Sequence, residues 1–203
     1  MNLNAKNMKN KNIINMSYII FALLFLQACS IDSFDDGQHS NLDAKYVLPY
    51  PVGKTYTCTQ GFNSNPSHFG SFYYSVDFGM SIGTYITAAR SGRVIYVVES
   101  NSDSDQTPGH ENVVIVMHED TTYARYVHLT LNGALVQVNQ TVACGDTVGL
   151  SGSSGTNGGS HLHFDVTKTF SGKSDQTIPF YFKNTSPHPN GLQRGVAYKA
   201  QPY

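Results

Sequence analysis

From Tyr46 onward the chain consists of many short runs of β-branched and aromatic residues, separated by Gly, Asn, Asp and Pro. Such runs favour strands, and the residues between them favour turns. No stretch has the 3.6-residue apolar period of an amphipathic helix. The sequence therefore predicts an all-β fold of antiparallel strands in a sheet or sandwich. The predicted strands are residues 54–60, 72–78, 85–89, 93–99, 112–118, 122–129, 136–138, 147–150 and 162–166.

The N-terminus has the pattern of an export signal. Three lysines (Lys6, Lys9 and Lys11) precede an apolar run at residues 18–26, which is too short to span a membrane. The run ends in Leu-Gln-Ala-Cys at residues 26–29, which resembles the lipidation motif of bacterial lipoproteins. We expect residues 1–28 to be removed and Cys29 to carry a lipid that anchors the protein to the bacterial membrane. Ser30 is compatible with the outer membrane if the host is Gram-negative; an ordinary secretory signal is the alternative.

The remaining chain divides into a tether, one domain and a tail. Residues 29–45 are polar and acidic, which predicts a flexible tether; residues 46–185 form the domain, and residues 186–203 are expected to be irregular. Of the 13 basic residues 10 follow Cys29, together with all 14 acidic ones. This mildly acidic body gives no reason to expect nucleic-acid binding, and we expect a monomer.

Two further cysteines, Cys58 and Cys144, follow the predicted lipidation site. In an exported protein an even number suggests a disulfide, so a Cys58–Cys144 bond is expected. Two separately buried thiols are the alternative, since a free cysteine packs like a small apolar residue.

The run His-Leu-His-Phe-Asp-Val at residues 161–166 combines core and polar positions. Strand side chains alternate between faces, so Leu162, Phe164 and Val166 share an apolar face. His161, His163 and Asp165 then share the other face. Two imidazoles at this spacing can both reach one small site, although a pair of surface histidines would show the same pattern.

Other residues offer ligands for a metal. Asp77 lies between two apolar residues of a predicted strand, His68 precedes it by nine positions, and His128 lies in another apolar run. A His-Asp-His set with one open position is a catalytic zinc arrangement. His110 and His118 are the alternatives to His68, but neither continues into the helical His-Glu-x-x-His motif.

An ordered set of segments resembles the lysostaphin/LytM-type zinc metallopeptidases, peptidase family M23, over most of residues 48–184. The resemblance implies a LytM-type β-sheet fold with an active-site groove, and one Zn²⁺ per chain bound by His68, Asp77 and His163. It implies His128 and His161 as the catalytic histidines. The segments that carry it include His68, residues 76–78, 83–89, 92–94, 112–115, 126–129, 145–149, 152–155 and 161–165.

The function implied by the resemblance is hydrolysis of cross-links or stem peptides of bacterial peptidoglycan. The nine-residue interval between His68 and Asp77 is longer than is usual in that family, which places a small loop or hairpin between the two ligands. The alternative is an inactive member that regulates other cell-wall hydrolases. Such proteins typically lose a ligand or a catalytic histidine, whereas all five positions are filled here.

Overall fold

The computed structural model describes residues 44–155, 158–171 and 175–203. The predicted signal peptide, Cys29 and nearly all of the predicted tether lie outside the described residues. Among the described residues no helix has the length and apolarity needed to cross a membrane.

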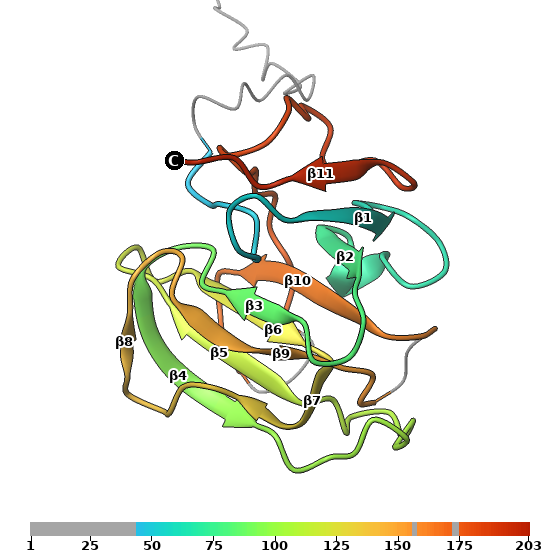
Figure 1. The fold of residues 1–203 in the computed structure, drawn as a ribbon, viewed down its shortest axis with the longest axis vertical. Coiled ribbons are helices and arrows are strands. Elements are labelled where there is room, and N and C mark those ends of the chain that lie inside the picture. The colour runs from blue at the N-terminus through green and yellow to red at the C-terminus, as the bar shows by residue number, and fades with distance from the viewer. Residues whose placement is uncertain (1–43, 156–157, 172–174) are drawn as a thin grey trace, which may run out of the picture. The chain divides into compact units, whose positions relative to one another are not determined.

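The fold is all-β and antiparallel, as the sequence predicts. An eight-stranded sheet has the order β11-β1-β2-β10-β6-β5-β4-β8 (Figure 1). Its strands are β1 (Thr55–Gln60), β2 (Ser75–Gly79), β4 (Gly92–Val98), β5 (Val113–Met117), β6 (Tyr123–Val127), β8 (Thr141–Val142), β10 (His161–Thr167) and β11 (Ala197–Lys199).

A second sheet has the order β3-β9-β7 and lies in front of the middle of the large sheet in Figure 1. Its strands are β3 (Tyr85–Thr87), β9 (Thr147–Ser151) and β7 (Leu129–Ala134). Both sheets contribute to one apolar core, in which Ile86 and Leu129 of the small sheet join Phe78 and Phe164 of the large one. The Tyr126 hydroxyl, fully buried in this core, is hydrogen-bonded to the backbone N–H of Ala89 at 2.7 Å.

Strand β10 organises the middle of the large sheet. Leu162, Phe164 and Val166 are completely buried, which confirms the apolar face predicted from the alternation. On one side β10 pairs with β2, so that His163 lies directly opposite Asp77. On the other side it pairs with β6, so that His163 also lies opposite Val127, the residue before His128. The register alone therefore brings three of the predicted site residues to one place.

Several strand predictions were wrong in detail. Residues 122–129 do not form one strand, because His128 has φ +65° and separates β6 from β7. Residues 136–138 form no strand, and β7, β8 and β11 were not predicted. The C-terminal segment, expected to be irregular, contains β11, whose buried Tyr198 pairs with Tyr56 of β1. Edge strands this short carry too little alternation to be recognised in a sequence.

The expected disulfide is not formed. Cys58 and Cys144 are both free cysteines, and each thiol lies against a different carbonyl group. The Cys58 thiol donates to the carbonyl of Gln60 at 3.1 Å within β1, whereas the Cys144 thiol lies 3.7 Å from the carbonyl of Ala89. The two thiols are therefore separate, but only Cys58 is buried, whereas the alternative expected both to be.

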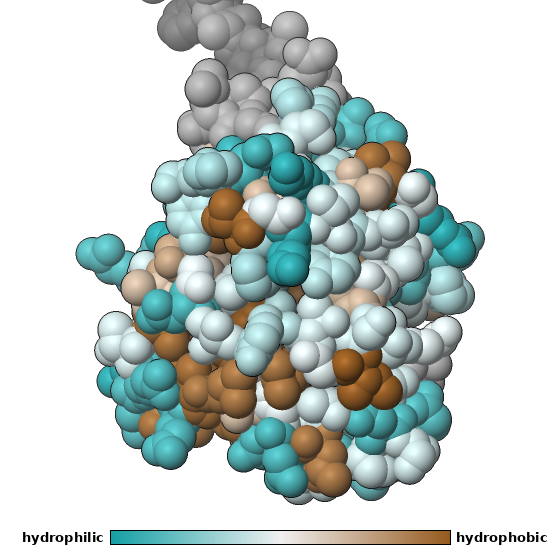
Figure 2. All heavy atoms as spheres, viewed as in Figure 1, coloured by the Kyte–Doolittle hydropathy of each residue, from teal (hydrophilic) through white to brown (hydrophobic). Residues whose placement is uncertain are grey.

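The surface in Figure 2 mixes polar and apolar side chains, with the apolar ones gathered mainly in the lower half of the view. Exposed apolar residues include Leu131 and Leu135, near the small sheet. Phe69 and Phe72 are also exposed and come from the loop between β1 and β2. That loop also carries the fully buried His68.

Candidate metal site and groove

Asp77 and His163 form the centre of the site. They are direct cross-strand neighbours in β2 and β10, and His163 Nδ1 lies 2.9 Å from Asp77 Oδ1. Asp77 is almost fully buried, and its other carboxylate oxygen accepts a hydrogen bond from the Gln60 side chain at 2.8 Å. Rigid strands thus hold the carboxylate and the imidazole together, as a precise site requires.

His68 reaches the same carboxylate from the loop between β1 and β2. The nine-residue interval to Asp77 is occupied by this loop, which includes the short 3-10 helix η2 (Gly70–Phe72). The His68 ring is completely buried, with Nε2 3.2 Å from Asp77 Oδ1. Its Nδ1–H donates to the carbonyl of Gly61 at 2.9 Å, which fixes the tautomer and turns the Nε2 lone pair toward Asp77.

The three side chains fit a divalent metal. Candidate ligand atoms of His68, Asp77 and His163 all lie within 4.8 Å of one another. Without a cation, two imidazole lone pairs would face one carboxylate oxygen, an arrangement that only a proton or a metal can stabilise. Although burial opposes it, hydrogen bonds with Asp165 and Asp77 raise the pKa of His163 to about 9 in the metal-free site. Two imidazoles and one carboxylate with an open position are a ligand set typical of catalytic zinc.

Asp165 supports His163 from the opposite side. His163 Nε2 lies 2.9 Å from Asp165 Oδ2, so its proton points away from Asp77. Asp165 is fully buried, and Arg125 of β6 binds both of its oxygens at 2.6 Å. Metal-bound histidines generally donate their second N–H to such a carboxylate, which orients the ring.

His128 lies in the strained backbone position between β6 and β7. Its Nδ1–H donates to the carbonyl of Ser154 at 2.7 Å, which leaves the Nε2 lone pair available. Asn112 holds the following backbone, since its side-chain amide donates to the carbonyls of Leu129 and Thr130 at 3.1 Å. Strained residues that are stabilised by their surroundings are concentrated at functional sites.

His161 packs beside His128, with 4.7 Å between the ring centroids. Its Nδ1–H donates to the carbonyl of Gly159, and Nε2 lies 3.7 Å from Asp77 Oδ2. Burial lowers the pKa of His161, and burial together with the neighbouring His161 and His163 lowers the pKa of His128 to about 3. Both imidazoles are therefore uncharged at neutral pH and can each accept a proton at Nε2.

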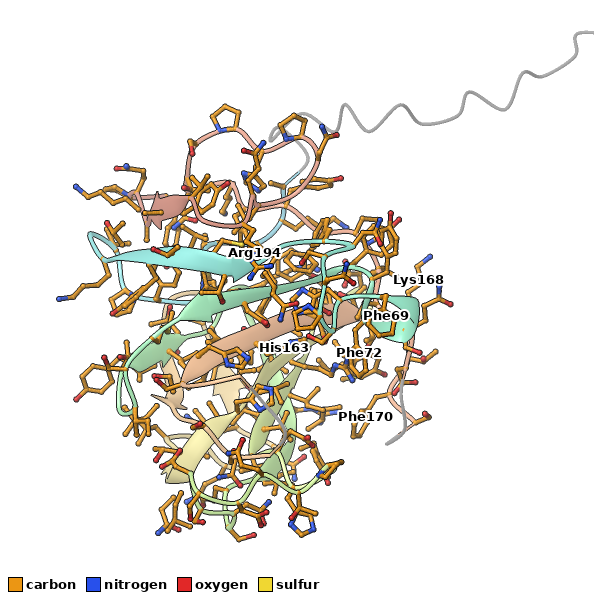
Figure 3. All side chains as sticks on the ribbon, turned by 90° about the vertical axis from the view of Figure 1, so that its right-hand side faces the viewer. Phe69, Phe72, His163, Lys168, Phe170 and Arg194 are labelled. Carbon is orange, nitrogen blue, oxygen red and sulfur yellow. The ribbon has the colours of Figure 1, made fainter. Side chains whose placement is uncertain are left out.

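Of the five predicted site residues, all but the fully buried His68 line one groove of about 580 Å³. Asp77, His128, His161 and His163 lie along it; its remaining described lining residues are Thr59, Gln60, Pro66, Ser67, Gly79, Gly158, Gly159, Ser160 and Arg194. Figure 3 shows His163 with Arg194 above it and the aromatic residues Phe69 and Phe72 to one side. The Phe72 ring meets the His163 ring edge-on, with 6.0 Å between centroids.

The structure decides between the candidate histidines. His110 is exposed and pairs with Asp105, and His118 is buried with Nδ1 bonded to the carbonyl of Ser91; neither joins the metal cluster of the described residues. Sequence reasoning placed Asp165 on the correct face but gave it no role. It missed Arg125, Gln60 and Asn112 altogether, because these act through the register and loop packing, for which the sequence offered no signal.

Two histidines and one aspartate that can hold a metal lie beside two uncharged histidines in an open groove. This arrangement is typical of metal-dependent hydrolases. A model of the family described as peptidase family M23 matches residues 71–177, a span that contains Asp77, His128, His161 and His163 and begins just after His68. The chain belongs to peptidase family M23.

Two curated relatives and one solved structure illustrate the similarity. Peptidoglycan DD-endopeptidase ShyB of Vibrio cholerae is 33% identical over 122 residues, which cover 58% of this chain and 26% of that protein. Glycyl-glycine endopeptidase ALE-1 of Staphylococcus capitis is 30% identical over 179 residues, covering 82% and 46%. The catalytic domain of a mutant of the prophage-encoded M23 protein EnpA from Enterococcus faecalis has a TM-score of 0.50 at 24% identity, covering 65% of this chain and 94% of that one, and shows the shared fold. This chain spans less than half the length of both curated relatives.

Proposed function

We propose that the protein is a zinc-dependent endopeptidase that hydrolyses peptide cross-links or stem peptides of bacterial peptidoglycan. The observation that carries the proposal is the convergence of His68, Asp77 and His163 at a groove beside two uncharged histidines. The five side chains that a hydrolytic zinc site of this family requires are all present and are oriented by hydrogen bonds. Nothing in the geometry favours an inactive regulator.

In this proposal His68, Asp77 and His163 hold the metal. Bound zinc supplies a Lewis acid and lowers the pKa of a coordinated water from 15.7 to about 7. His128 and His161 act as the general acid–base pair: an Nε2 lone pair accepts the proton of the attacking water, and the same proton is returned to the departing amine. Their Nδ1–H groups are fixed by the carbonyls of Ser154 and Gly159, so only Nε2 is free to do this.

The substrate follows from the relatives by analogy. One is named for a DD-endopeptidase activity on peptidoglycan and the other for cleavage of glycyl-glycine bonds. Both names describe endopeptidases, and the open groove suits a peptide strand that enters and leaves at its ends. We therefore propose D-alanyl–diaminopimelate cross-links or glycine bridges as the bonds cleaved.

Metal removal with purified peptidoglycan tests the proposal. The zinc-free protein should release no soluble muropeptides, and one equivalent of Zn²⁺ should restore release. His163→Ala should lose zinc and activity together. His128→Ala should lose activity but keep zinc, because His128 is not a ligand. Full zinc loss in that variant would contradict our assignment, and an inactive wild-type protein with bound zinc would favour a regulator instead.

We also propose that the protein is exported and attached to the bacterial membrane through a lipid on Cys29, as a monomer. The support is the sequence alone: three lysines, a short apolar run and Leu-Gln-Ala before the cysteine. Radiolabelled palmitate should be incorporated into the wild-type protein and not into Cys29→Ala. A labelled Cys29→Ala protein, or a wild-type protein recovered unlabelled from the medium, would exclude the anchor; light scattering of the protein without residues 1–29 would test the monomer.

A further inference from the structure

Arg194 introduces a positive charge into the groove that the proposed chemistry does not use. Among the described residues that line the groove, it is the one lysine or arginine. The one acidic residue there, Asp77, is already bound by His68 and His163. Two neutral imidazoles, one carboxylate and a divalent metal leave the site at net +1, so Arg194 adds to a positive potential. This contrasts with the mildly acidic body of the chain.

The guanidinium has few partners of its own. Its Nη1 donates to the carbonyl of Asn65 at 3.4 Å, near the limit for a hydrogen bond. None of the described carboxylates lies within ion-pair distance of it. A guanidinium has five N–H donors in a planar fork that matches a carboxylate. Most of these donors are therefore available to a ligand in the groove.

The backbone around Arg194 is fixed. The N–H of Gln193 donates to the Tyr198 hydroxyl at 2.9 Å, and the N–H of Gly195 donates to the carbonyl of Cys58 at 2.8 Å. Leu192 is buried in the core. Strand β11 and the preceding turn thus place Arg194 over the end of β1 and above His163 (Figure 3). The C-terminal segment, which carries none of the zinc ligands, gains a role in presenting this one side chain.

We propose that Arg194 is a specificity-determining residue that binds a free carboxylate of the substrate beside the scissile bond. This inference rests on the proposed function and narrows its substrate class. In a D-alanyl–diaminopimelate cross-link the amine side of the bond carries a carboxylate on the carbon next to the nitrogen. A glycine bridge has none there. The protein therefore prefers carboxylate-bearing cross-links to amidated cross-links and to glycine bridges.

Binding and cleavage are to be measured separately. Two cross-linked peptides are used, identical except that one has this carboxylate amidated. Binding is measured by calorimetry on zinc-loaded His128→Ala, which does not cleave them. The free carboxylate should improve Kd about tenfold, as expected for one charge-assisted hydrogen-bonded pair. The preference should disappear in His128→Ala/Arg194→Gln and be partly retained in His128→Ala/Arg194→Lys. It should also weaken at high salt.

Cleavage by otherwise wild-type protein should follow the same pattern. Arg194→Gln should raise KM about tenfold for the peptide with the free carboxylate. The KM for the amidated peptide should not change, and neither should kcat or the zinc content. Arg93→Gln is the matched control, because Arg93 is exposed on β4 outside the groove and its loss changes the net charge equally. Equal binding of the two peptides, or an equal loss for both in Arg194→Gln, would overturn the inference. A clear binding preference without any cleavage would instead leave the inference standing and refute the proposed function.

Discussion

His163 Nε2 and Asp165 Oδ2 lie 2.9 Å apart on the same strand, two residues from each other. Because Asp165 accepts a hydrogen bond from Nε2–H of His163, the lone pair on Nδ1 is directed at Asp77. Asp165 is itself held by both of its oxygens on Arg125. The alternation of one strand thus supplies both a metal ligand and the group that orients it.

Asp165→Asn should weaken zinc binding without removing a ligand. The side-chain amide can still accept the hydrogen bond from His163 Nε2–H, but it carries no negative charge. Zinc affinity should therefore fall about 10- to 100-fold. The zinc-free protein should also lose about 3–5 kcal/mol of stability, because Arg125 is left buried without its partner. Chelator competition measures the first effect and urea unfolding the second.

The double variant Asp165→Asn/Arg125→Met separates these two effects. Removing both charges should recover most of the stability, whereas zinc affinity should stay low, since His163 still lacks its carboxylate. A single variant that binds zinc as tightly as wild type would show that Asp165 serves only the fold.

The positive φ of His128 should affect the stability of variants at this position. At φ +65° a β-branched residue is strained, while asparagine adopts this conformation readily. His128→Val should therefore be about 1–3 kcal/mol less stable than His128→Asn in urea unfolding. Both variants should be inactive and keep their zinc. Equal stability of the two variants would mean that the backbone relaxes at this position.

Strand alternation predicted which side chains of β10 lie in the core and which lie on the polar face, although it gave no role to Asp165. A period of two places Leu162 and Phe164 in the core and His163 with Asp165 on the polar face, and the structure has both arrangements. The all-β class was equally predictable, because short β-rich runs between turn residues exclude long helices. These features depend on local sequence, which is why they could be read directly.

Features that depend on long-range packing were not predictable. Nothing local indicates that Arg125 lies opposite Asp165, since that requires the register of β6 on β10. His128 appeared to continue a strand, because a single residue with positive φ leaves no trace in an apolar pattern. The edge strand β11 is recognised only through its pairing with β1, and with it the position of Arg194 over the groove.

The thiols should differ in reactivity. Cys58 is buried, and burial, assisted by the negative charge of Asp77, raises its pKa to about 12, so it stays protonated and unreactive. Cys144 is partly exposed. Ellman's reagent should therefore titrate one thiol in the folded protein lacking residues 1–29 and two after denaturation. A count of zero after denaturation without reductant would restore the disulfide.

His188 makes the stability of the C-terminal segment depend on pH. Its buried ring accepts a hydrogen bond at Nε2 from the N–H of Phe182 at 3.0 Å, and Nδ1–H donates to the carbonyl of Ser186 at 2.8 Å. Protonation of Nε2 would break the first bond, and burial lowers the pKa of His188. In the unfolded chain its pKa is about 6.5.

Since the unfolded state binds this proton more readily, the contribution of His188 to stability is complete above about pH 6.5 and is lost as the pH falls below that value. The slope of this loss against pH should approach a limit of about 1.4 kcal/mol per pH unit. His188→Gln does not titrate and should lack this component. The free energy of unfolding in urea is measured for zinc-free wild type and zinc-free His188→Gln between about pH 8 and about pH 5. The difference between the two proteins isolates the contribution of His188, because the other histidines contribute equally to both. A difference that stays constant over this range would show that His188 is not held neutral by the fold.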